Sequence, residues 1–281
     1  MNIDLTKMAT FGVAGNFTGH LEQAGEDKDF LNIKTAEAIA PKALFPTYIP
    51  GAENTAVVPA FLGTFPFDSS KIIFPEGEEK LQIEPECAIV FNVIWENKKV
   101  VELKPVCFGA SNDCSIRKEG AKKISLKKNW GNYSKGFSAH QIGLDSFTPD
   151  SIINKYRIAS FLVRDGIAYS YGEDSAVRDY SYVYQKLTAW IIDRLNNQID
   201  EGPAEMVNAY LNAINCPEQI FVSIGATRYT DFGEHNFLQK GDDAVVILYP
   251  ESDFTAEQIK QIAEGKITAP ESVSVLKQKI Y

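Results

Sequence analysis

Short apolar runs separated by polar turns dominate the pattern of this chain. Residues 81–91 and 100–110 are two such runs, and the polar segment Glu96-Asn97-Lys98-Lys99 between them has the length of a hairpin connection. Residues 156–164 alternate between apolar and polar side chains and end at Asp165-Gly166, a strong turn signal, which predicts a second hairpin. The pattern predicts further strands over residues 72–74, 167–171, 219–224 and 244–249 and in the C-terminal tail.

Helical periodicity is confined to a few segments. Residues 180–197 place Tyr180, Tyr184, Leu187 and Ile191 at helical spacing, which predicts one long helix. Shorter helices are expected just after Gly19, over 29–40, over 203–213 and after Thr255. Because strands outnumber helices and no strand–helix–strand alternation is visible, the pattern favours a β-rich α+β fold with a mixed or antiparallel sheet over a doubly wound one.

Composition narrows the class of partner. The chain has 281 residues, 44% of them hydrophobic, and a formal net charge of −9, which argues against nucleic acid or an anionic membrane as the main partner. The basic segment 122–128 is interpreted as a solvated loop or hairpin face rather than a nucleic-acid patch. No apolar run reaches the ~20 residues of a membrane span and no signal peptide is visible, so we expect a cytoplasmic protein with no membrane partner.

Three acidic residues stand out because two predicted strands would bring them together. Glu84 and Glu86 lie two residues apart at the start of the first apolar run and so share one face of it, and Asp113 follows the second run. Converging carboxylates need a cation, and oxygen-only ligation selects Mg²⁺, Mn²⁺ or Ca²⁺. The alternatives are a solvent-facing pair of glutamates on a strand edge and a turn-forming or helix-capping Asp113.

Two further residues have a context that suits chemistry. His20 follows a glycine-rich turn and opens a short helical stretch, a position for a general base on a mobile lid, although a lone histidine is usually structural. Lys135 lies between two small residues and is either a solvated lysine or a cation held over an anionic intermediate.

The order of these residues is similar to that of the motifs of the fumarylacetoacetate hydrolase superfamily. The Gly-Arg-Asn-Tyr-x-x-His motif of that superfamily resembles residues 14–20, and its Glu-x-Glu motif resembles residues 84–90. Its Asn-Asp-x-Ser-x-Arg and Ala-Lys-x-Phe motifs resemble residues 112–117 and 134–137. Its later hairpin, Thr-Gly-Thr-Pro loop and Gly-Asp turn resemble Asp165-Gly166, residues 224–227 and Gly241-Asp242. The likeness runs from about residue 10 to residue 250.

The resemblance implies a fold and an assembly. The fold is a rolled mixed β-sheet with few flanking helices. Residues 1–75 would form an N-terminal segment that carries a short helical lid around His20, and residues 76–281 would form the catalytic β-roll. The resemblance also implies a homodimer.

The resemblance assigns roles to individual residues as well. Glu84, Glu86 and Asp113 would hold a divalent cation, most simply Mg²⁺, to which a 2-oxo or 2,4-dioxo acid binds. Lys135 would stabilise the enolate that forms when the carbon–carbon bond breaks, and His20 would activate water. The substrate-binding positions would be Asn16, Phe17, Gly225 and Thr227.

The departures from the motifs concern the region around the histidine. The arginine of the first motif is Gly15 here, and the glutamate that usually follows the histidine by three residues is Gln23, which cannot act as a base. Glu22 is the neighbouring candidate for that role, but on a helix it would point about 100° away from Gln23. The first hypothesis is therefore a metal-dependent hydrolase that cleaves a carbon–carbon bond. Decarboxylation, hydration, isomerisation and non-catalytic binding of a 2-oxo acid are the alternatives.

Overall fold

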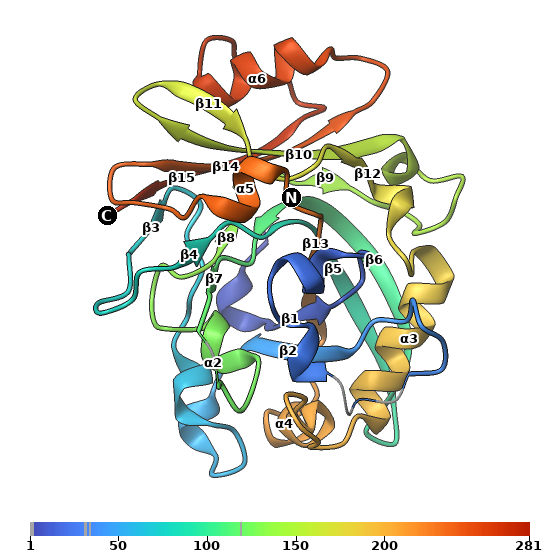
Figure 1. Cartoon of the computed structure of the whole chain (residues 1–281). Helices are drawn as coiled ribbons and strands as arrows, with labels where there is room; N and C mark the ends of the chain where they lie inside the picture. The colour runs from blue at the N-terminus through green and yellow to red at the C-terminus, as the bar shows by residue number, and fades with distance from the viewer. Residues whose placement is uncertain (1–2, 31–32, 34, 119) are drawn as a thin grey trace.

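Two curled sheets form the body of the protein. The computed structural model describes residues 3–30, 33, 35–118 and 120–281. The larger sheet has seven strands in the order β2-β1-β13-β5-β6-β8, with β9 paired to β6 (Figure 1). Strands β1 and β13 are parallel and the other pairs are antiparallel, so the sheet is mixed. Its strands are β1 Ala9–Ala14, β2 Ala43–Tyr48, β5 Pro85–Glu96, β6 Lys99–Asn112, β8 Gly136–Phe137, β9 Ile142–Gly143 and β13 Gln219–Ala226.

The smaller sheet packs against β5, β6 and β8 of the larger one. It has six strands in the order β11-β10-β14-β15-β3, with β12 paired to β10. Its strands are β3 Lys71–Ile72, β10 Tyr156–Arg164, β11 Ile167–Ser170, β12 Ser175–Ala176, β14 Asp243–Pro250 and β15 Ser274–Ile280. A separate two-stranded pair lies near the ends of β5 and β6 and consists of β4 Leu81–Gln82 and β7 Ser115–Ile116.

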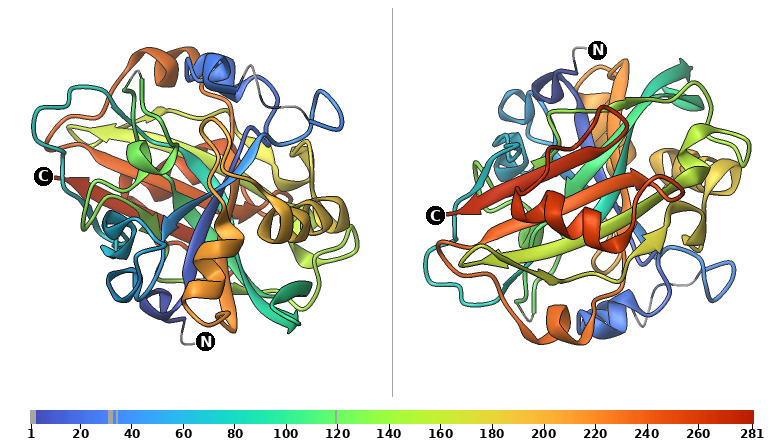
Figure 2. Two further views of the ribbon diagram at one scale, coloured as in Figure 1. Left: turned by 90° about the horizontal axis from the view of Figure 1, so that it is seen from below. Right: turned by 90° about the horizontal axis from the view of Figure 1, so that it is seen from above.

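Six α-helices in the described part of the chain flank the sheets. They are α1 His20–Gln23, α2 Ser125–Lys128, α3 Tyr184–Asn197, α4 Val207–Ala213, α5 Asp231–His235 and α6 Ala256–Glu264. Helix α3 packs against β6, and α6 covers the outer face of the smaller sheet at β10, β11 and β14 (Figures 1 and 2). The 3-10 helices are η1 Leu5–Lys7, η2 Asp27–Phe30, η3 Ala52–Asn54, η4 Ala60–Gly63, η5 Ile152–Lys155 and η6 Val177–Asp179. No helix among the described residues is both long and apolar enough to span a bilayer.

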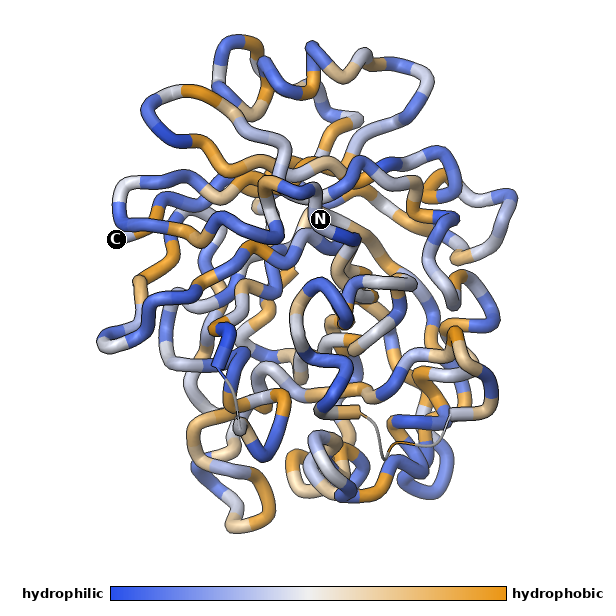
Figure 3. Tube along the Cα trace, viewed as in Figure 1, coloured by the Kyte–Doolittle hydropathy of each residue, from blue (hydrophilic) through white to orange (hydrophobic). Residues whose placement is uncertain are grey.

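The core lies between the two sheets and under α3. Hydrophobic residues follow the central strands, whereas hydrophilic residues gather in the peripheral loops (Figure 3). Leu44, Ile89, Phe108, Val222 and Val246 are all fully buried in one continuous cluster. A second cluster under α6 closes the outer side of the smaller sheet. Burial of both faces explains why several strands read as apolar runs rather than as alternating patterns.

The structure confirms the predicted β-rich fold and both hairpins. β5 pairs with β6 across the turn at Asn97 and Lys98, and β10 pairs with β11 across Asp165-Gly166. Strands β1 and β2 belong to the same sheet as β5 and β6, so the sheet crosses the predicted boundary at residue 75. That division into two segments stays a prediction.

Three helix predictions need correction. The long helix begins at Tyr184 rather than at residue 180, because the hydroxyl of Tyr180 donates a hydrogen bond to the carbonyl of Gly225 and the chain is extended at Val183. The helix predicted over 203–213 begins only at Val207. Of the helix predicted over 29–40, residues 31, 32 and 34 lie outside the described residues, and residues 36–40 form turns and bends. Tertiary hydrogen bonds override local propensity at Tyr180.

We predict that Gly233→Ala lowers the free energy of unfolding by about 1–3 kcal/mol, the usual cost of overpacking. An added Cβ at Gly233 would lie 2.0 Å from the carbonyl oxygen of Tyr171, which is backbone and cannot rotate away. Urea denaturation measures the change. Gly143→Ala is the matched control, because its Cβ would meet no atom within 4 Å. Equal stability of the two variants would contradict the packing described at Gly233.

Candidate active site

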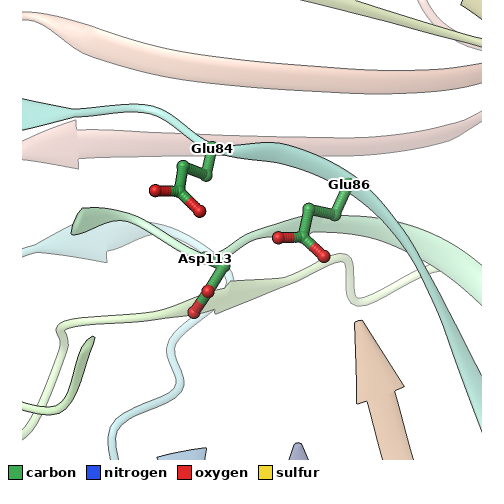
Figure 4. A group of neighbouring side chains, drawn as sticks. All are labelled: Glu84, Glu86 and Asp113. Atoms are coloured by element: carbon green, nitrogen blue, oxygen red, sulfur yellow. The ribbon is translucent and has the colours of Figure 1, made fainter. Parts of the chain in front are cut away.

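The register of the β5–β6 hairpin brings three carboxylates together. The amide of Asp113 donates a hydrogen bond of 3.0 Å to the carbonyl of Glu84, and Glu86 lies opposite Ser111. One oxygen from each of Glu84, Glu86 and Asp113 lies within 4.8 Å of the others (Figure 4). All three side chains are buried, so water does not screen their mutual repulsion.

A chain of amide side chains fixes this end of the hairpin to the smaller sheet. Asn112 Oδ1 accepts a hydrogen bond from the amide of Glu84 at 3.1 Å, and Asn112 Nδ2 donates to Gln278 Oε1 at 3.0 Å. Gln278 Nε2 in turn donates to the carbonyl of Lys135 at 3.1 Å. A Cβ at Gly136 would lie 2.3 Å from Gln278 Oε1, so only glycine fits beside Lys135. The two sheets therefore set the position of Lys135 relative to the carboxylates.

Three cations contact the carboxylates directly. Lys128 Nζ lies 2.5 Å from Glu84 Oε2 and 2.8 Å from Asp113 Oδ2. Lys135 Nζ lies 3.2 Å from Asp113 Oδ1, and Arg117 Nη2 lies 2.9 Å from Glu84 Oε1. Glu86 is the exception, because its Oε2 accepts a hydrogen bond of 2.8 Å from the amide of Gly225 and no cation contacts it in the described part of the chain.

A fourth acidic residue, Glu26, extends the ion-pair network. Glu26 Oε1 lies 2.8 Å from Arg117 Nη1 and 2.9 Å from Lys127 Nζ, and Glu26 is itself buried. The interpretation of segment 122–128 as a solvated face is therefore wrong at Lys127 and Lys128, which are 4% and 2% exposed. They lie in helix α2, whose lysines point inward to the acids.

The pKa values within the cluster diverge. Burial alone would raise the pKa of Glu84, but Lys128 and Arg117 hold it well below its usual range. Burial, with the charges of Asp113 and Glu84, raises the pKa of Glu86 well above its usual range. Burial and the neighbouring Lys128 lower the pKa of Lys135, although Asp113 opposes the shift. Such divergence within one buried cluster is typical of functional sites.

His20 lies on the other side of the same cluster. It begins α1, its ring lies 5.2 Å from that of Tyr229, and its Nδ1 has no hydrogen-bond partner among the described residues. Burial is the main cause that lowers the pKa of His20, so its neutral form predominates at pH 7. His20, Glu84, Glu86 and Lys128 all line a cavity of about 20 Å³. A space of that size holds about one water molecule.

Gln23, which occupies the position of the expected glutamate, uses its side-chain amide in hydrogen bonds to the fold. Gln23 Oε1 accepts a hydrogen bond from the amide of Tyr229 at 2.8 Å, and Gln23 Nε2 donates to the carbonyl of Tyr229 and to Glu234. Glu22 is exposed on α1 and does not reach the cluster. No carboxylate on α1 therefore contacts His20.

The other residues predicted to bind substrate are held by the fold. Asn16 uses its side chain to bridge the backbone at Tyr182 and Ile224, with hydrogen bonds of 2.8–3.0 Å. Phe17 packs edge-on against the ring of Tyr180. Gly225 contacts the cluster through the hydrogen bond to Glu86, and Thr227 is buried with an Oγ1 that has no hydrogen-bond partner within the part of the chain that the structure describes.

A larger polar pocket of about 500 Å³ lies outside α1. Residues 22–26 line it, together with the cations Lys80, Arg117 and Lys127. His20, Leu21 and Glu26 line the small cavity. The segment from His20 to Glu26 is thus the wall between the two spaces.

Sequence reasoning missed Glu26, Lys127 and Lys128. All three occur in strongly charged segments that read as solvated surface. The only available signal was the surplus of buried acid at residues 84–113, which requires compensating cations from elsewhere in the chain.

The fold has counterparts among solved structures. A protein from Oleispira antarctica assigned as a fumarylacetoacetate isomerase/hydrolase is 12% identical, with a TM-score of 0.52 over 98% of this chain and 93% of that one. A 2-keto-3-deoxyarabinonate dehydratase is 12% identical, with a TM-score of 0.53 over 97% of this chain and 73% of that one. A protein from Mycobacterium smegmatis assigned as HpcE is 15% identical, with a TM-score of 0.53 over 97% and 74%.

These counterparts confirm the predicted fold, that of fumarylacetoacetate hydrolase-like proteins, in a divergent sequence. Among curated proteins, no sequence matches this one. A sequence family described as "Family of unknown function (DUF5718)" matches residues 26–280, which is most of the chain. The protein is therefore a member of family DUF5718 and has the fold of the fumarylacetoacetate hydrolase superfamily.

Proposed function

We propose that this protein is an enzyme that acts on a small 2-oxo or 2,4-dioxo acid through an enolate, most simply by hydrolytic carbon–carbon cleavage. The observation that carries the proposal is the buried group of Glu84, Glu86 and Asp113, with Lys135 against Asp113 and His20 across a water-sized cavity. This group combines charge stabilisation with a proton acceptor inside a fold that enzymes share.

The donor atoms suit a hard divalent cation such as Mg²⁺. Glu84, Glu86 and Asp113 offer only carboxylate oxygens, and their ligand atoms lie within 4.8 Å of one another. Oε1 of Glu86 has no partner among the described residues, which leaves it available as a ligand. When bound, such an ion would polarise the keto group of the acid and favour its enolate.

Lys135 supplies charge that matters most in the transition state. Its ammonium group is held by Asp113 and by the carbonyl of Cys114, inside a water-excluded site. A fixed cation in such a place stabilises a developing enolate oxygen more than it stabilises the ground-state ketone. Lys135 is therefore the proposed electrostatic group of the reaction.

His20 is the proposed base. Its neutral ring borders a cavity large enough for about one water molecule, and its Nδ1 has no hydrogen-bond partner in the described part of the chain. In the hydrolysis, the water proton would move to His20 while hydroxide adds to the distal carbonyl. The carbon–carbon bond then breaks, its electron pair forms the enolate, and a proton from His20 returns to the enolate carbon.

The hydrogen bonds of Gln23 favour a second class of candidate reactions. Because no carboxylate on α1 orients His20, its strength as a base toward water is reduced relative to a His-Glu pair. Decarboxylation or isomerisation of a 2-oxo acid also passes through an enolate but does not require a water nucleophile. The same residues would act in these reactions.

Access to the site requires movement of the wall between the two cavities. The cavity beside the carboxylates is too small for a 2-oxo acid, whereas the pocket outside α1 is about 500 Å³ and lined with cations that suit an acid. We propose that the segment from His20 to Glu26 shifts to admit substrate. We also propose that the protein is a homodimer, as the resemblance to the superfamily implies.

We predict that Lys135→Met lowers kcat on acylpyruvates or oxaloacetate by roughly 100-fold or more, as removal of a charge-stabilising donor does. Steady-state kinetics on a panel of these acids measures the change, after circular dichroism has shown that the variant folds. Lys104→Met is the control, because Lys104 is exposed and pairs with Glu102 rather than with the cluster. A folded Lys135→Met variant with unchanged kcat would remove Lys135 from the mechanism.

We predict that His20 is neutral at pH 6.5, because burial lowers its pKa below the ordinary value. Two-bond ¹H–¹⁵N correlation spectra of the histidine rings distinguish the neutral from the charged form. His235 is the internal control. The hydrogen bond between its exposed ring and the carbonyl of Asp231 raises its pKa, so His235 stays protonated to higher pH than His20. Protonation of both rings over one pH range would argue against His20 as a base.

A further inference from the structure

Helix α2 inserts a lysine between two of the three carboxylates. Lys128 Nζ lies 2.5 Å from Glu84 Oε2 and 2.8 Å from Asp113 Oδ2, and the side chain is 2% exposed. These oxygens belong to two of the three residues that would hold a divalent ion. The ammonium group therefore occupies contacts that such an ion would need.

The remaining oxygens are almost all engaged as well. Oε1 of Glu84 pairs with Arg117 at 2.9 Å, and Oδ1 of Asp113 pairs with Lys135 at 3.2 Å. Oε2 of Glu86 accepts the hydrogen bond from Gly225. Among the described residues only Oε1 of Glu86 has neither a cation nor a donor beside it, whereas Oε1 of Glu84 and Oδ2 of Asp113 face their cations without accepting a hydrogen bond. An ion that used more than the one uncontacted oxygen would therefore displace a cationic side chain.

We propose that the ammonium group of Lys128 is the resident cation of this carboxylate cluster, and that a divalent metal ion binds there only by displacing it. The proposal rests on the carboxylate site of the proposed function and adds a residue that regulates its occupancy. The chain then has two states of the site. In one, Lys128 neutralises Glu84 and Asp113; in the other, a metal ion does so.

The surroundings of Lys128 give the displaced ammonium a place to go. The cavity of about 20 Å³ is lined by Lys128 and also by Glu26, Glu86 and His20. Its volume suffices for one small polar group. The aliphatic stem lies beside the ring of Phe45, with Nζ 5.3 Å from the ring centroid, and a four-carbon stem can rotate without moving the helix. A rotation of Lys128 toward Glu26 would release both oxygens.

Removal of this lysine is expected to increase metal affinity. The native site must break two charge-assisted contacts of Lys128 before it binds an ion, and the variant Lys128→Met has none to break. Because the variant does not have to break these contacts, we expect Mn²⁺ to bind it about 10- to 100-fold more tightly than it binds the native chain.

Isothermal titration of chelator-treated protein with MnCl₂ tests the proposal. Lys104→Met is the control, because Lys104 is exposed and pairs with Glu102 rather than with the cluster or with Glu26. We expect its Mn²⁺ affinity to stay within about threefold of native, while Lys128→Met binds at least tenfold more tightly. Adding Glu86→Gln to Lys128→Met should abolish the gain, which locates the ion at the cluster.

The outcomes separate the inference from the proposed function. Equal and tight Mn²⁺ binding by native protein and Lys128→Met overturns the role of Lys128 but leaves the metal centre standing. Binding by Lys128→Met alone supports the role of Lys128 and removes a metal requirement from the native enzyme. Absence of binding to either protein overturns both.

A measurement on the native chain covers the case in which Lys128→Met does not fold. The ¹⁵Nζ resonance of a buried ammonium group is observable by NMR and is assigned here with the charge-conserving Lys128→Arg. Saturating Mg²⁺ should shift the Lys128 resonance as its ion pairs break. An unchanged Lys128 resonance in protein shown to contain bound Mg²⁺ would overturn the proposal.

Discussion

The register of one hairpin determines the site on which the rest of the structure converges. Because β5 and β6 pair so that Asp113 lies opposite Glu84, three carboxylates share a buried space that no single strand could create. A shift of one residue would turn these side chains to the other face of the sheet. The Asn112–Gln278–Lys135 chain secures that register from the second sheet. The fold thus holds together charges that repel one another.

The compensation of these charges explains the arrangement of the flanking segments. The paired acids Glu84, Asp113 and Glu26 each contact two cationic side chains. A buried ion that loses its partner costs about 3–5 kcal/mol, so the segments that carry these cations are tied to the hairpin. Helix α2 consists of only four residues, and its ion pairs rather than its length keep it in place.

Local patterns in the sequence were sufficient for the strands and the acids but not for the cations. The apolar runs, the Asp165-Gly166 turn and the spacing of Glu84 and Glu86 all reflect local geometry, and the structure has them as predicted. Lys128 and Glu26 lie in charged segments, and their burial depends on partners that are distant in sequence. The start of α3 was also missed, because the hydrogen bond from Tyr180 to Gly225 spans 45 residues. Long-range pairing of polar groups leaves no periodic signal in a sequence.

The position of Lys128 has a consequence for how the protein is made and maintained. In many metalloproteins the acidic site is destabilising until the ion arrives, so the supply of metal limits the yield of folded chain. Here the counter-charge is encoded in the polypeptide, and the ion pairs of Lys128 form during folding itself. Folding therefore does not require a metal ion to neutralise Glu84 and Asp113.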